Sequence, residues 1–571
     1  MKKFVYLFIF LFVLHIVGCD NQVVDRSKNT PPPAAFPNIQ DNNNYSNKEQ
    51  NRLAINPEAL EVLAQEVGKS PDELTWEDLQ NIRTFHIDHE KKAIGNALKY
   101  LENLETLYIN IPIDLSFLPE LESVKFLQVE ELKTSEVVHL SKLKQLEYLI
   151  LHGYSFSDFD FLSSLNQLHT LDLSYIGLEN LSQFPVMENL KHLHINDSTL
   201  PDLDAISNFP NLESLHLSFD EADDLSPIEN LGNLESLFIS SSYIDSTNFL
   251  KNLHNLKNLT MIHSTINDLS SISNLKELTT LNLFGSTISN MESIRHLPQV
   301  ENLDLSYTQL KDLSLIAHLS NLKSLNLTSL EITDLSPLKH LQQLEELDLT
   351  NNVLIDISPL VQLKNLKKLI LFGTRLSDFS SLNNMEQLEE LNLSSTNFHD
   401  LSLIENLTNL KRLYLASTEI VNFASLENFH QLNELSLYNT KIETLEPLVK
   451  LKNLKTLTLS ETQISDFSIL ETMAQLETLN LSFTAIEDLS PISQLTNLKS
   501  LDLSYTMVNN LTPLKNLNQL EALYIEGSKV TSIRPLIGLK NLNFVVLNKD
   551  RINDWNLLNS IPNIEIMDIK Y

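Results

Sequence analysis

Apolar residues along most of the chain recur in one short spacing, L-x-x-L-x-L, in which isoleucine or valine sometimes replaces leucine. From Leu146 to Ile564 the pattern returns every 22 residues without an insertion. Three earlier units begin at Ile82, Leu104 and Val124, which gives 23 units in all. Within a unit, apolar and polar residues alternate at period two, and this alternation predicts a short strand with one buried face.

A single unit cannot bury its own leucines, whereas units stacked side by side share a continuous core. With neighbouring strands about 4.8 Å apart, such a stack forms a parallel sheet of roughly 110 Å along its arc. The period of 22 residues is typical of the leucine-rich repeat, whose units place a strand inside and a turn or 3₁₀ segment outside. We therefore expect an α/β repeat solenoid over residues 82–571, a leucine-rich-repeat horseshoe with a parallel concave sheet and a 3₁₀ or turn convex side.

The segment that closes each unit points to a subclass. The stretch Ile332-Thr333-Asp334-Leu335-Ser336-Pro337-Leu338 resembles the closing segment of bacterial internalins. Seven units carry a proline in this phase, namely Pro227, Pro337, Pro359, Pro447, Pro491, Pro513 and Pro535. Residues 52–81 resemble the helical cap that precedes internalin repeats. The resemblance implies that the concave sheet binds a protein.

The chain departs from the internalin pattern eight residues after the first leucine of each unit, where asparagine is usual. Asn352 is there once, Leu330 and Ile176 are exceptions, and the position is usually a threonine or serine, such as Thr308, Thr374, Thr396, Thr418, Thr440, Thr462, Thr484, Thr506 or Ser528. Short polar side chains bond the backbone of an adjacent turn, so we interpret this row as structural. No base accompanies it, so it has no support as a catalytic row.

Acidic and basic residues alternate in two columns. The position after the first leucine holds Glu301, Lys323, Glu345, Lys367, Glu389 and Lys411, and the next position holds Glu346, Lys368, Glu390, Arg412 and Glu434. On stacked strands each acid would lie between two bases, and a register slip would bring like charges together. We interpret the columns as register control; ligand binding is the alternative.

The first residues are typical of a secretory signal. Lys2 and Lys3 precede an apolar run over residues 4–18 that is too short to cross a bilayer comfortably. Ile16-Val17-Gly18-Cys19 resembles the lipobox of bacterial lipoproteins, which implies cleavage before Cys19 and lipid on its thiol. We expect a signal peptide at residues 1–18, a lipid-anchored disordered tether at 19–51, and a bacterial cell-envelope lipoprotein that faces the periplasm or the exterior. A plain signal peptide and an uncleaved anchor are the alternatives.

Composition narrows the partners and the chemistry. The formal net charge of −33 argues against nucleic acid and predicts a soluble monomer. One cysteine allows no intramolecular disulfide. The chain has no Gly-rich phosphate loop, no H-E-x-x-H and no G-x-S-x-G motif, so we expect neither an enzyme nor a cofactor.

Outward positions of the predicted strands carry aromatic residues, and exposed rings on a concave sheet suit the centre of an interface. The strand ends carry Phe219, Tyr307, Phe483 and Tyr505. The predicted partner-binding residues are Phe238, Phe284, Phe372, Tyr414, Tyr438, Phe483, Tyr505 and Tyr524. The alternative is that some of these rings fold down and pack on their neighbours.

Histidines gather early in the array. His192 and His194 share one strand and one face, and His216 and Asp172 lie on the strands to either side. Three imidazoles and a carboxylate could ligate zinc. We prefer a solvated polar surface, because nothing in the sequence supplies the outer shell of a tight metal site, and we predict no metal site.

The function that these features favour is a lipid-anchored recognition scaffold outside the cytoplasm, which binds a protein through the concave face. A glycan is the less favoured ligand. A bracing component of the cell envelope without a discrete ligand is one alternative. An enzyme inhibitor that docks over an active site is another.

Overall fold

The computed structural model divides into two compact units, residues 1–57 and 58–571. It describes residues 55–89, 91–153, 159–178, 181–196, 203–220, 224–241, 243–562 and 564–570. The predicted signal peptide, Cys19 and the predicted tether lie outside the described residues, and the domain boundaries stay predictions. No helix in the described part of the chain combines the length and the apolar character that a membrane crossing requires.

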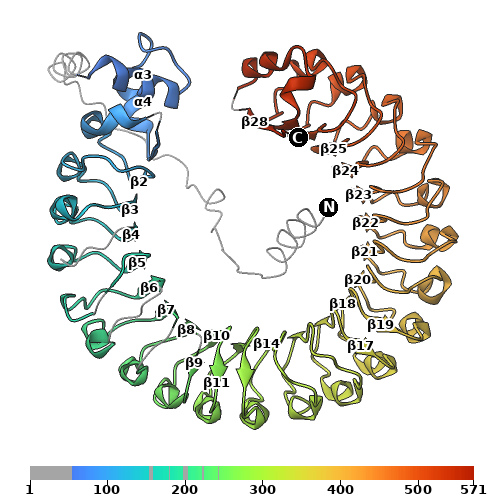
Figure 1. Cartoon of the computed structure of the whole chain (residues 1–571), viewed down its shortest axis with the longest axis horizontal. Helices are drawn as coiled ribbons and strands as arrows, with labels where there is room; N and C mark the ends of the chain where they lie inside the picture. The colour runs from blue at the N-terminus through green and yellow to red at the C-terminus, as the bar shows by residue number, and fades with distance from the viewer. Residues whose placement is uncertain are drawn as a thin grey trace, which may run out of the picture. The chain divides into compact units, whose positions relative to one another are not determined.

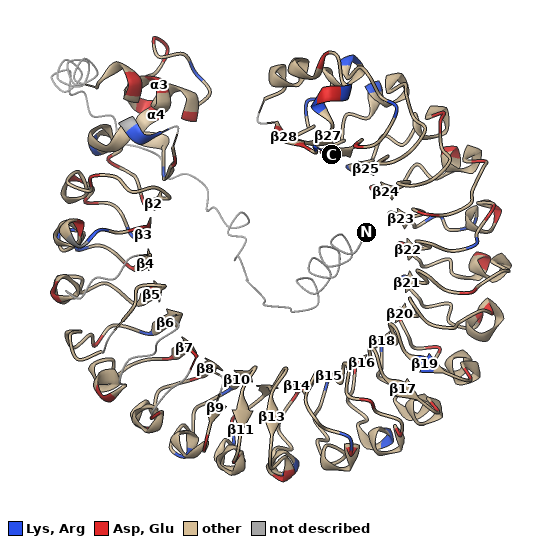
Figure 2. Cartoon of the chain, in the orientation of Figure 1, with Lys and Arg blue, Asp and Glu red and all other residues tan. Residues whose placement is uncertain are grey.

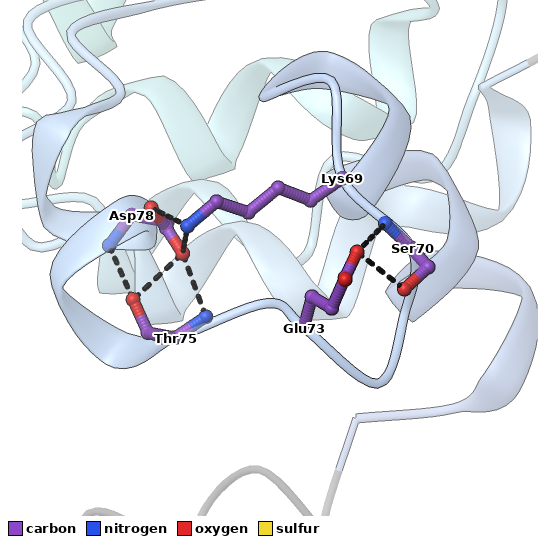
Figure 3. Close-up of polar contacts among 5 residues, drawn as sticks. All are labelled: Lys69, Ser70, Glu73, Thr75 and Asp78. Atoms are coloured by element: carbon purple, nitrogen blue, oxygen red, sulfur yellow. Dashed lines mark hydrogen bonds and ion pairs between the residues drawn. The ribbon is translucent and has the colours of Figure 1, made fainter.

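A small helical cap precedes the repeats, formed by α3 (Pro57–Glu66) and α4 (Trp76–Asn81). A capping box begins α4: Thr75 Oγ1 accepts the Asp78 N–H at 3.2 Å, and the Asp78 carboxylate accepts the Thr75 N–H at 2.8 Å. Lys69 Nζ donates to both Asp78 oxygens at 2.7 Å (Figure 3). The hydrogen bonds from Lys69 first, and then from Thr75, lower the pKa of Asp78 to about 2.

The repeats form one parallel sheet of 23 strands over the described residues. Its strands are β1 (Thr84–Ile87), β2 (Thr106–Ile109), β3 (Phe126–Glu130), β4 (Tyr148–His152), β5 (Thr170–Ser174), β6 (His192–Asn196), β7 (Ser214–Ser218), β8 (Ser236–Ser240), β10 (Asn258–Ile262), β12 (Thr280–Asn282), β14 (Asn302–Asp304), β15 (Ser324–Asn326), β16 (Glu346–Asp348), β18 (Lys368–Ile370), β20 (Glu390–Asn392), β21 (Arg412–Tyr414), β22 (Glu434–Ser436), β23 (Thr456–Thr458), β24 (Thr478–Asn480), β25 (Ser500–Asp502), β26 (Ala522–Tyr524), β27 (Phe544–Leu547) and β28 (Glu565–Asp568). Each strand pairs with the strand of the next unit, so the sheet follows the chain order.

Two smaller parallel ladders follow the main strands in some units. They are β9 (Tyr243–Ile244) with β11 (Thr265–Ile266) and β13 (Thr287–Ile288), and β17 (Val353–Leu354) with β19 (Arg375–Leu376). The return path of each unit is mostly a short 3₁₀ segment, from η1 (Lys92–Tyr100) to η22 (Trp555–Ser560), with one α-helical turn, α5 (Val137–Leu140).

The fold class is confirmed as a leucine-rich-repeat horseshoe. In Figure 1 the main strands lie along the inner side of the arc and the 3₁₀ segments lie outside. Residues 22 apart pair in register, as Leu149 does with Leu171 and Leu171 with Leu193. The last step is shorter, because Glu565 pairs with Phe544, 21 residues earlier. The predicted 22-residue phase is therefore wrong for the last unit, where Ile566 of β28 is only half-buried and the core leucine spacing is weaker.

Positions are numbered here from the first leucine of each unit as position 1. Positions 4 and 6 point into the core: Leu501 and Leu503 of one unit are both 0% exposed. Positions 3, 5 and 7 point to the concave side, as the alternation along a strand requires. Same-position residues of successive units therefore form rows across the sheet.

Prolines and aspartates shape the convex turns. The seven prolines of the sequence pattern lie in the first turn of a 3₁₀ segment, where a missing N–H costs nothing. An aspartate precedes many of these segments and accepts a backbone N–H from their first residue, as where Asp488 Oδ1 accepts the Ser490 N–H at 2.9 Å. That backbone hydrogen bond is the largest of the causes that lower the pKa of Asp488.

The alternating charges form ion pairs between successive units, while acidic residues occur on most turns of the arc (Figure 2). At position 2 the pairs are Lys323 with Glu301 at 2.8 Å, Lys367 with Glu345 at 2.9 Å, and Lys411 with Glu389 at 2.7 Å. At position 3, Arg412 contacts Glu390 at 2.6 Å. The neighbours predicted from the two columns are therefore in contact.

The threonines of the position 9 row bond within their own unit, whereas Ser286 Oγ donates to the Met261 carbonyl of the preceding unit at 3.0 Å. Thr308 Oγ1 donates to the Leu305 carbonyl three residues earlier at 2.6 Å, and Thr418 does the same to Leu415 at 2.7 Å. Asn352 reaches further: its Nδ2 donates to the Leu327 carbonyl of the preceding unit at 2.8 Å and to the Leu349 carbonyl at 2.9 Å. For the threonines, the structure thus replaces the expected bond to an adjacent turn with a bond inside one unit.

Candidate binding surface on the concave face

At position 5 of the outward rows, an aspartate or asparagine usually fastens the backbone. In seven units its Oδ1 accepts the backbone N–H two residues later, as in Asp304 with Ser306 and Asn480 with Ser482, both at 2.9 Å, whereas Asp172 accepts the Ser174 hydroxyl. The same backbone bond is made by Asn282, Asn326, Asp348, Asn392 and Asp502. These side chains fasten the end of the strand through one oxygen, Oδ1.

Aromatic residues interrupt that row at three of the predicted binding positions, Phe238, Tyr414 and Tyr524, and a ring cannot accept the backbone hydrogen bond. After Tyr414 the N–H of Ala416 instead donates to Ser394 Oγ at 3.2 Å. The fold therefore gives up a local hydrogen bond to place these rings on the concave face.

Position 8 adopts the left-handed backbone conformation in most units. Tyr175, Tyr307, Phe483 and Tyr505 have φ between 56° and 59° there, where other units carry glycine, serine or asparagine. A left-handed backbone costs a residue with a side chain roughly 1 kcal/mol or more. The four rings are between 37% and 68% exposed, so they are held at this cost on the surface and not in the core.

Side chains at position 8 lean toward the next unit. A Cβ added to Gly527 would lie 2.6 Å from Tyr505 Cδ1, and one added to Gly285 would lie 2.8 Å from His263 Nδ1. The ring of Tyr505 therefore covers the glycine of the following unit. Its other neighbour in the row is Phe483, whose ring stacks on it with centroids 4.3 Å apart and planes 10° apart.

The predicted site residues form separate groups and no single patch. Phe238 stacks on His216 at 3.8 Å, Phe284 lies between His263 at 5.0 Å and Tyr307 at 5.4 Å, and Tyr524 contacts Phe544 at 5.7 Å. Phe238, Phe284, Phe372, Tyr414 and Tyr524 are half-buried, whereas Tyr438, Phe483 and Tyr505 are exposed. Phe219, expected at a strand end with the exposed rings, is 5% exposed and belongs to the core; its φ is not in the left-handed range.

Tyr414 and Tyr438 lie among charged groups. Burial first, and then the carboxylates of Glu434 and Glu390, raise the pKa of the Tyr414 hydroxyl. The Tyr438 hydroxyl donates to Glu461 Oε1 at 3.0 Å. Each of these tyrosines thus has an apolar ring edge and a hydroxyl held beside a carboxylate.

A stripe of rings at the start of the sheet was not predicted. It crosses five successive units from position 5 to position 2: His86 stacks on Tyr108 at 4.3 Å, Tyr108 meets Phe126 at 5.2 Å, Phe126 meets Tyr148 at 6.1 Å, and Tyr148 meets His169 at 4.6 Å. The 20-residue step between the units that begin at Leu104 and Val124, together with the change of position, hides the stripe from a search along one column. Alignment of neighbouring outward positions across that step would have found it.

The early histidines do not converge on a metal site. His194 Nδ1 lies 3.4 Å from Asp172 and its ring lies 5.2 Å from that of His216, which packs on Phe238. Burial, and then His194, lower the pKa of His216 to about 4, against an opposing effect of Asp172. Over the described residues, the three groups whose ligand atoms come within 4.8 Å of one another are instead Asp114, Glu136 and His139 on the convex side. Asp114 and Glu136 already accept backbone N–H groups, from Ser116 and Leu115 respectively.

Comparison with known proteins agrees with the fold. The family model "Leucine Rich repeats (2 copies)" matches residues 298–340, 430–472 and 474–519. Among curated proteins, none matches the chain. Similar solved structures include the TLR13–ssRNA13 complex, which is 19% identical over 82% of this chain and 86% of that one, with a TM-score of 0.54. An internalin (inlF) from Listeria monocytogenes is 24% identical over 61% of this chain and 90% of that one, with a TM-score of 0.38, and internalin C2 from the same organism is 31% identical over 34% and 84%, with a TM-score of 0.30.

The repeat and the parallel sheet of the described residues give the chain a leucine-rich-repeat fold, and the family model matches three segments of it. Proteins of this class are generally binding scaffolds.

Proposed function

We propose that the protein is a recognition scaffold outside the cytoplasm, anchored by a lipid on Cys19, and that its concave face binds a protein partner. The similar TLR13 structure is a complex with single-stranded RNA. The charge of −33 on this chain argues against an RNA ligand, because phosphate groups would be repelled.

One observation carries the proposal: aromatic rings occupy concave positions that the fold fills elsewhere with small or hydrogen-bonding residues. Tyr414 and Tyr524 replace the asparagine or aspartate that fastens the strand end, and Phe483 and Tyr505 hold a left-handed backbone. Both arrangements have a cost for the solenoid, because a ring cannot accept the strand-end hydrogen bond and a left-handed backbone is strained. Large rings with polar tips are the side chains that contribute most to protein interfaces, which explains their retention.

The test uses substitutions taken from the same rows. Phe372→Ser, Tyr414→Asn and Tyr438→Ser together install residues found at positions 7 and 5 of other units, as in Ser394 and Asn392, so the fold is retained. Chemical crosslinking on intact cells, followed by affinity purification and mass spectrometry, identifies a partner of the wild-type chain. We expect the triple variant to lose that partner.

A matched control removes exposed apolar groups outside the sheet. Ile355 and Val421 are 68% and 74% exposed, and serine at both positions should leave the partner bound. Equal capture by the wild type and the triple variant would contradict the proposal and favour a bracing role. Loss of the partner in both variants would show that it binds elsewhere.

The lipid anchor is tested separately. A Cys19→Ser variant should move from the membrane fraction to the soluble fraction and should lose incorporation of a labelled fatty acid. A membrane-bound Cys19→Ser protein would contradict lipid anchoring and leave the concave-face proposal untouched.

A further inference from the structure

The end of the concave sheet combines exposed rings with buried carboxylates. We define the C-terminal patch as Phe483, Asp502, Tyr505, Tyr524 and Glu526, which come from three successive units around β24, β25 and β26. Asp502 pairs directly with Tyr524 across the sheet. The Tyr505 N–H donates to the Glu526 carbonyl at 2.8 Å, so both acids belong to residues that adjoin the ring-bearing ones. Burial first, and then the carboxylates of Asp502 and Glu526, raise the pKa of the Tyr524 hydroxyl.

The rings of the patch form a fixed platform. Phe483 and Tyr505 stack at 4.3 Å, and Tyr505 lies over Gly527, where no Cβ intrudes. Phe483 is 52% exposed and Tyr505 is 37% exposed. Because neighbouring units hold both rings, a ligand that contacts them meets a surface that is already ordered, with little side-chain entropy left to lose.

The carboxylates of the patch lack a countercharge. Burial raises the pKa of Asp502, and the groups that oppose this effect are Ser504, Ser482 and Asn480, with no cation among them. Burial also raises the pKa of Glu526, Asp502 adds to that effect, and Glu526 Oε2 is buried without a hydrogen-bond partner among the described residues. Two acids that repel each other therefore lie next to the ring platform.

Glu390, another acid of the concave side, is neutralised by Arg412 at 2.6 Å. Asp304, in the same row as Asp502, also has no cation beside it and accepts hydrogen bonds from Ser306 and Asn326. The C-terminal patch differs in holding two acids, one of which has a buried oxygen without a hydrogen-bond partner among the described residues, although unpaired buried acids weaken the folded chain. A site that keeps acids unpaired beside exposed rings is complementary to a cationic group with an apolar or planar surface.

We infer that the C-terminal patch binds a basic segment of the protein partner, with an arginine side chain stacked on the Phe483–Tyr505 platform and paired with Asp502 and Glu526. A guanidinium is planar, stacks on aromatic faces and forms two parallel hydrogen bonds with a carboxylate, so it fits both parts of the patch. The net charge of −33 would attract such a segment from a distance. The inference rests on the proposed function, since it specifies the chemistry of a partner on the concave face.

Binding of a defined probe tests the inference. The probe is a fluorescein-labelled peptide of alternating glycine and arginine, and its control replaces each arginine with citrulline, which keeps the planar shape without the charge. Fluorescence polarisation at fixed ionic strength should show binding of the arginine peptide and at least tenfold weaker binding of the citrulline peptide. Asp502→Asn with Glu526→Gln, and separately Phe483→Ser with Tyr505→Ser, should each weaken binding of the arginine peptide about tenfold.

Matched controls separate the patch from the overall charge. Asp304→Asn with Asp348→Asn removes two buried carboxylates from the same row elsewhere in the sheet, and Tyr175→Ser with Tyr307→Ser removes two exposed rings with the same backbone conformation. Both controls should change affinity less than twofold. Equal weakening in the patch and control variants would overturn the inference in favour of non-specific attraction, as would equal binding of the two peptides or no binding of either.

Capture of the partner on cells separates a failure of the patch inference from a failure of the proposed function. If the partner captured on cells is lost in the Phe372, Tyr414 and Tyr438 variant but is retained by Asp502→Asn with Glu526→Gln, the concave-face function stands and the patch inference fails. If neither variant affects capture, both fail.

Discussion

Two exceptions in the position 9 row, Leu330 and Asn352, compensate for each other. Leu330 cannot donate to the Leu327 carbonyl as a threonine would, and Asn352 Nδ2 makes that bond from the next unit at 2.8 Å. Asn352 Oδ1 also accepts the N–H groups of Leu330 at 3.3 Å and Ile332 at 2.9 Å. Asn352 is 1% exposed, so water cannot replace it when it is removed.

The cost of Asn352→Thr follows from these contacts. A threonine would keep the bond to Leu349, as Thr308 bonds Leu305, but it would leave the Leu327 carbonyl and two N–H groups without partners. At about 1 kcal/mol for each lost bond, the variant should be destabilised by about 3 kcal/mol. Leu330→Thr alone should cost about 2 kcal/mol for lost apolar burial.

The double variant should recover part of the loss. A threonine at position 330 can bond Leu327 itself and accept the Ile332 N–H, as Thr396 does for Phe398 at 3.3 Å. We therefore expect a coupling of about 2–3 kcal/mol between the two substitutions, well above the additivity error of about 0.5 kcal/mol. A shift of 3 kcal/mol corresponds to roughly 100-fold faster exchange of protected amides.

Hydrogen–deuterium exchange followed by mass spectrometry measures the effect where it arises, over residues 324–356, which avoids a two-state assumption for a long repeat array. Asn352→Thr should accelerate exchange in this segment, and the double variant should slow it again. Additive effects of the two substitutions would refute the compensation. Thr418→Val, which removes one bond from a regular unit, provides the control and should cost about 1 kcal/mol.

Three further predictions concern charge, pH and capping. Burial raises the pKa of Asp304, so the wild type loses stability as pH rises through that pKa. Urea unfolding at pH 7 should therefore show that Asp304→Asn stabilises the protein by roughly 0.5–1 kcal/mol. This gain should vanish in acid, and a gain that persists there would contradict the reasoning. The pKa of His216 is lowered to about 4 in the folded protein, so between about pH 6.5 and pH 4 the imidazole is protonated in the unfolded chain but not in the folded one. The free energy of unfolding should therefore fall as pH falls over this range. Thermal melts of His216→Asn should show a smaller loss than the wild type. Thr75→Ala removes the N-cap side chain of α4 and should destabilise this helix by about 1 kcal/mol. Faster amide exchange should be confined to α3 and α4. Faster exchange across the whole sheet would show instead that these helices nucleate the repeat array.

The sequence predicted the sheet and its register because burial depends on the leucine spacing. A slip of one residue would turn Leu501 and Leu503 to solvent, so the phase could be read from the pattern alone. The ion pairs between units followed from the same phase. The helical cap and the proline-bearing turns could be anticipated because their signals are local.

The details of the concave rows could not be predicted in this way. The left-handed backbone at Phe483 and Tyr505 is imposed by the turn that follows the strand, while the residue types themselves favour other conformations. Asp304 fastens the strand end because the turn brings the Ser306 N–H, two residues later, within reach of its carboxylate. The absence of a countercharge at Asp502 depends on which side chains the neighbouring units bring, so composition alone could not show it.

The lean of position 8 over the following unit gives the array a direction. A Cβ at Gly527 would lie 2.6 Å from Tyr505 Cδ1, so a side chain there would force the Tyr505 ring to move, whereas Phe483 leans over a unit that carries the stacked Tyr505 ring. Modules of this protein are therefore not interchangeable, although they share one length and one core. The array can lengthen by duplication of two adjacent units together, whereas moving a single unit to another place would break the contacts that hold the rings in place.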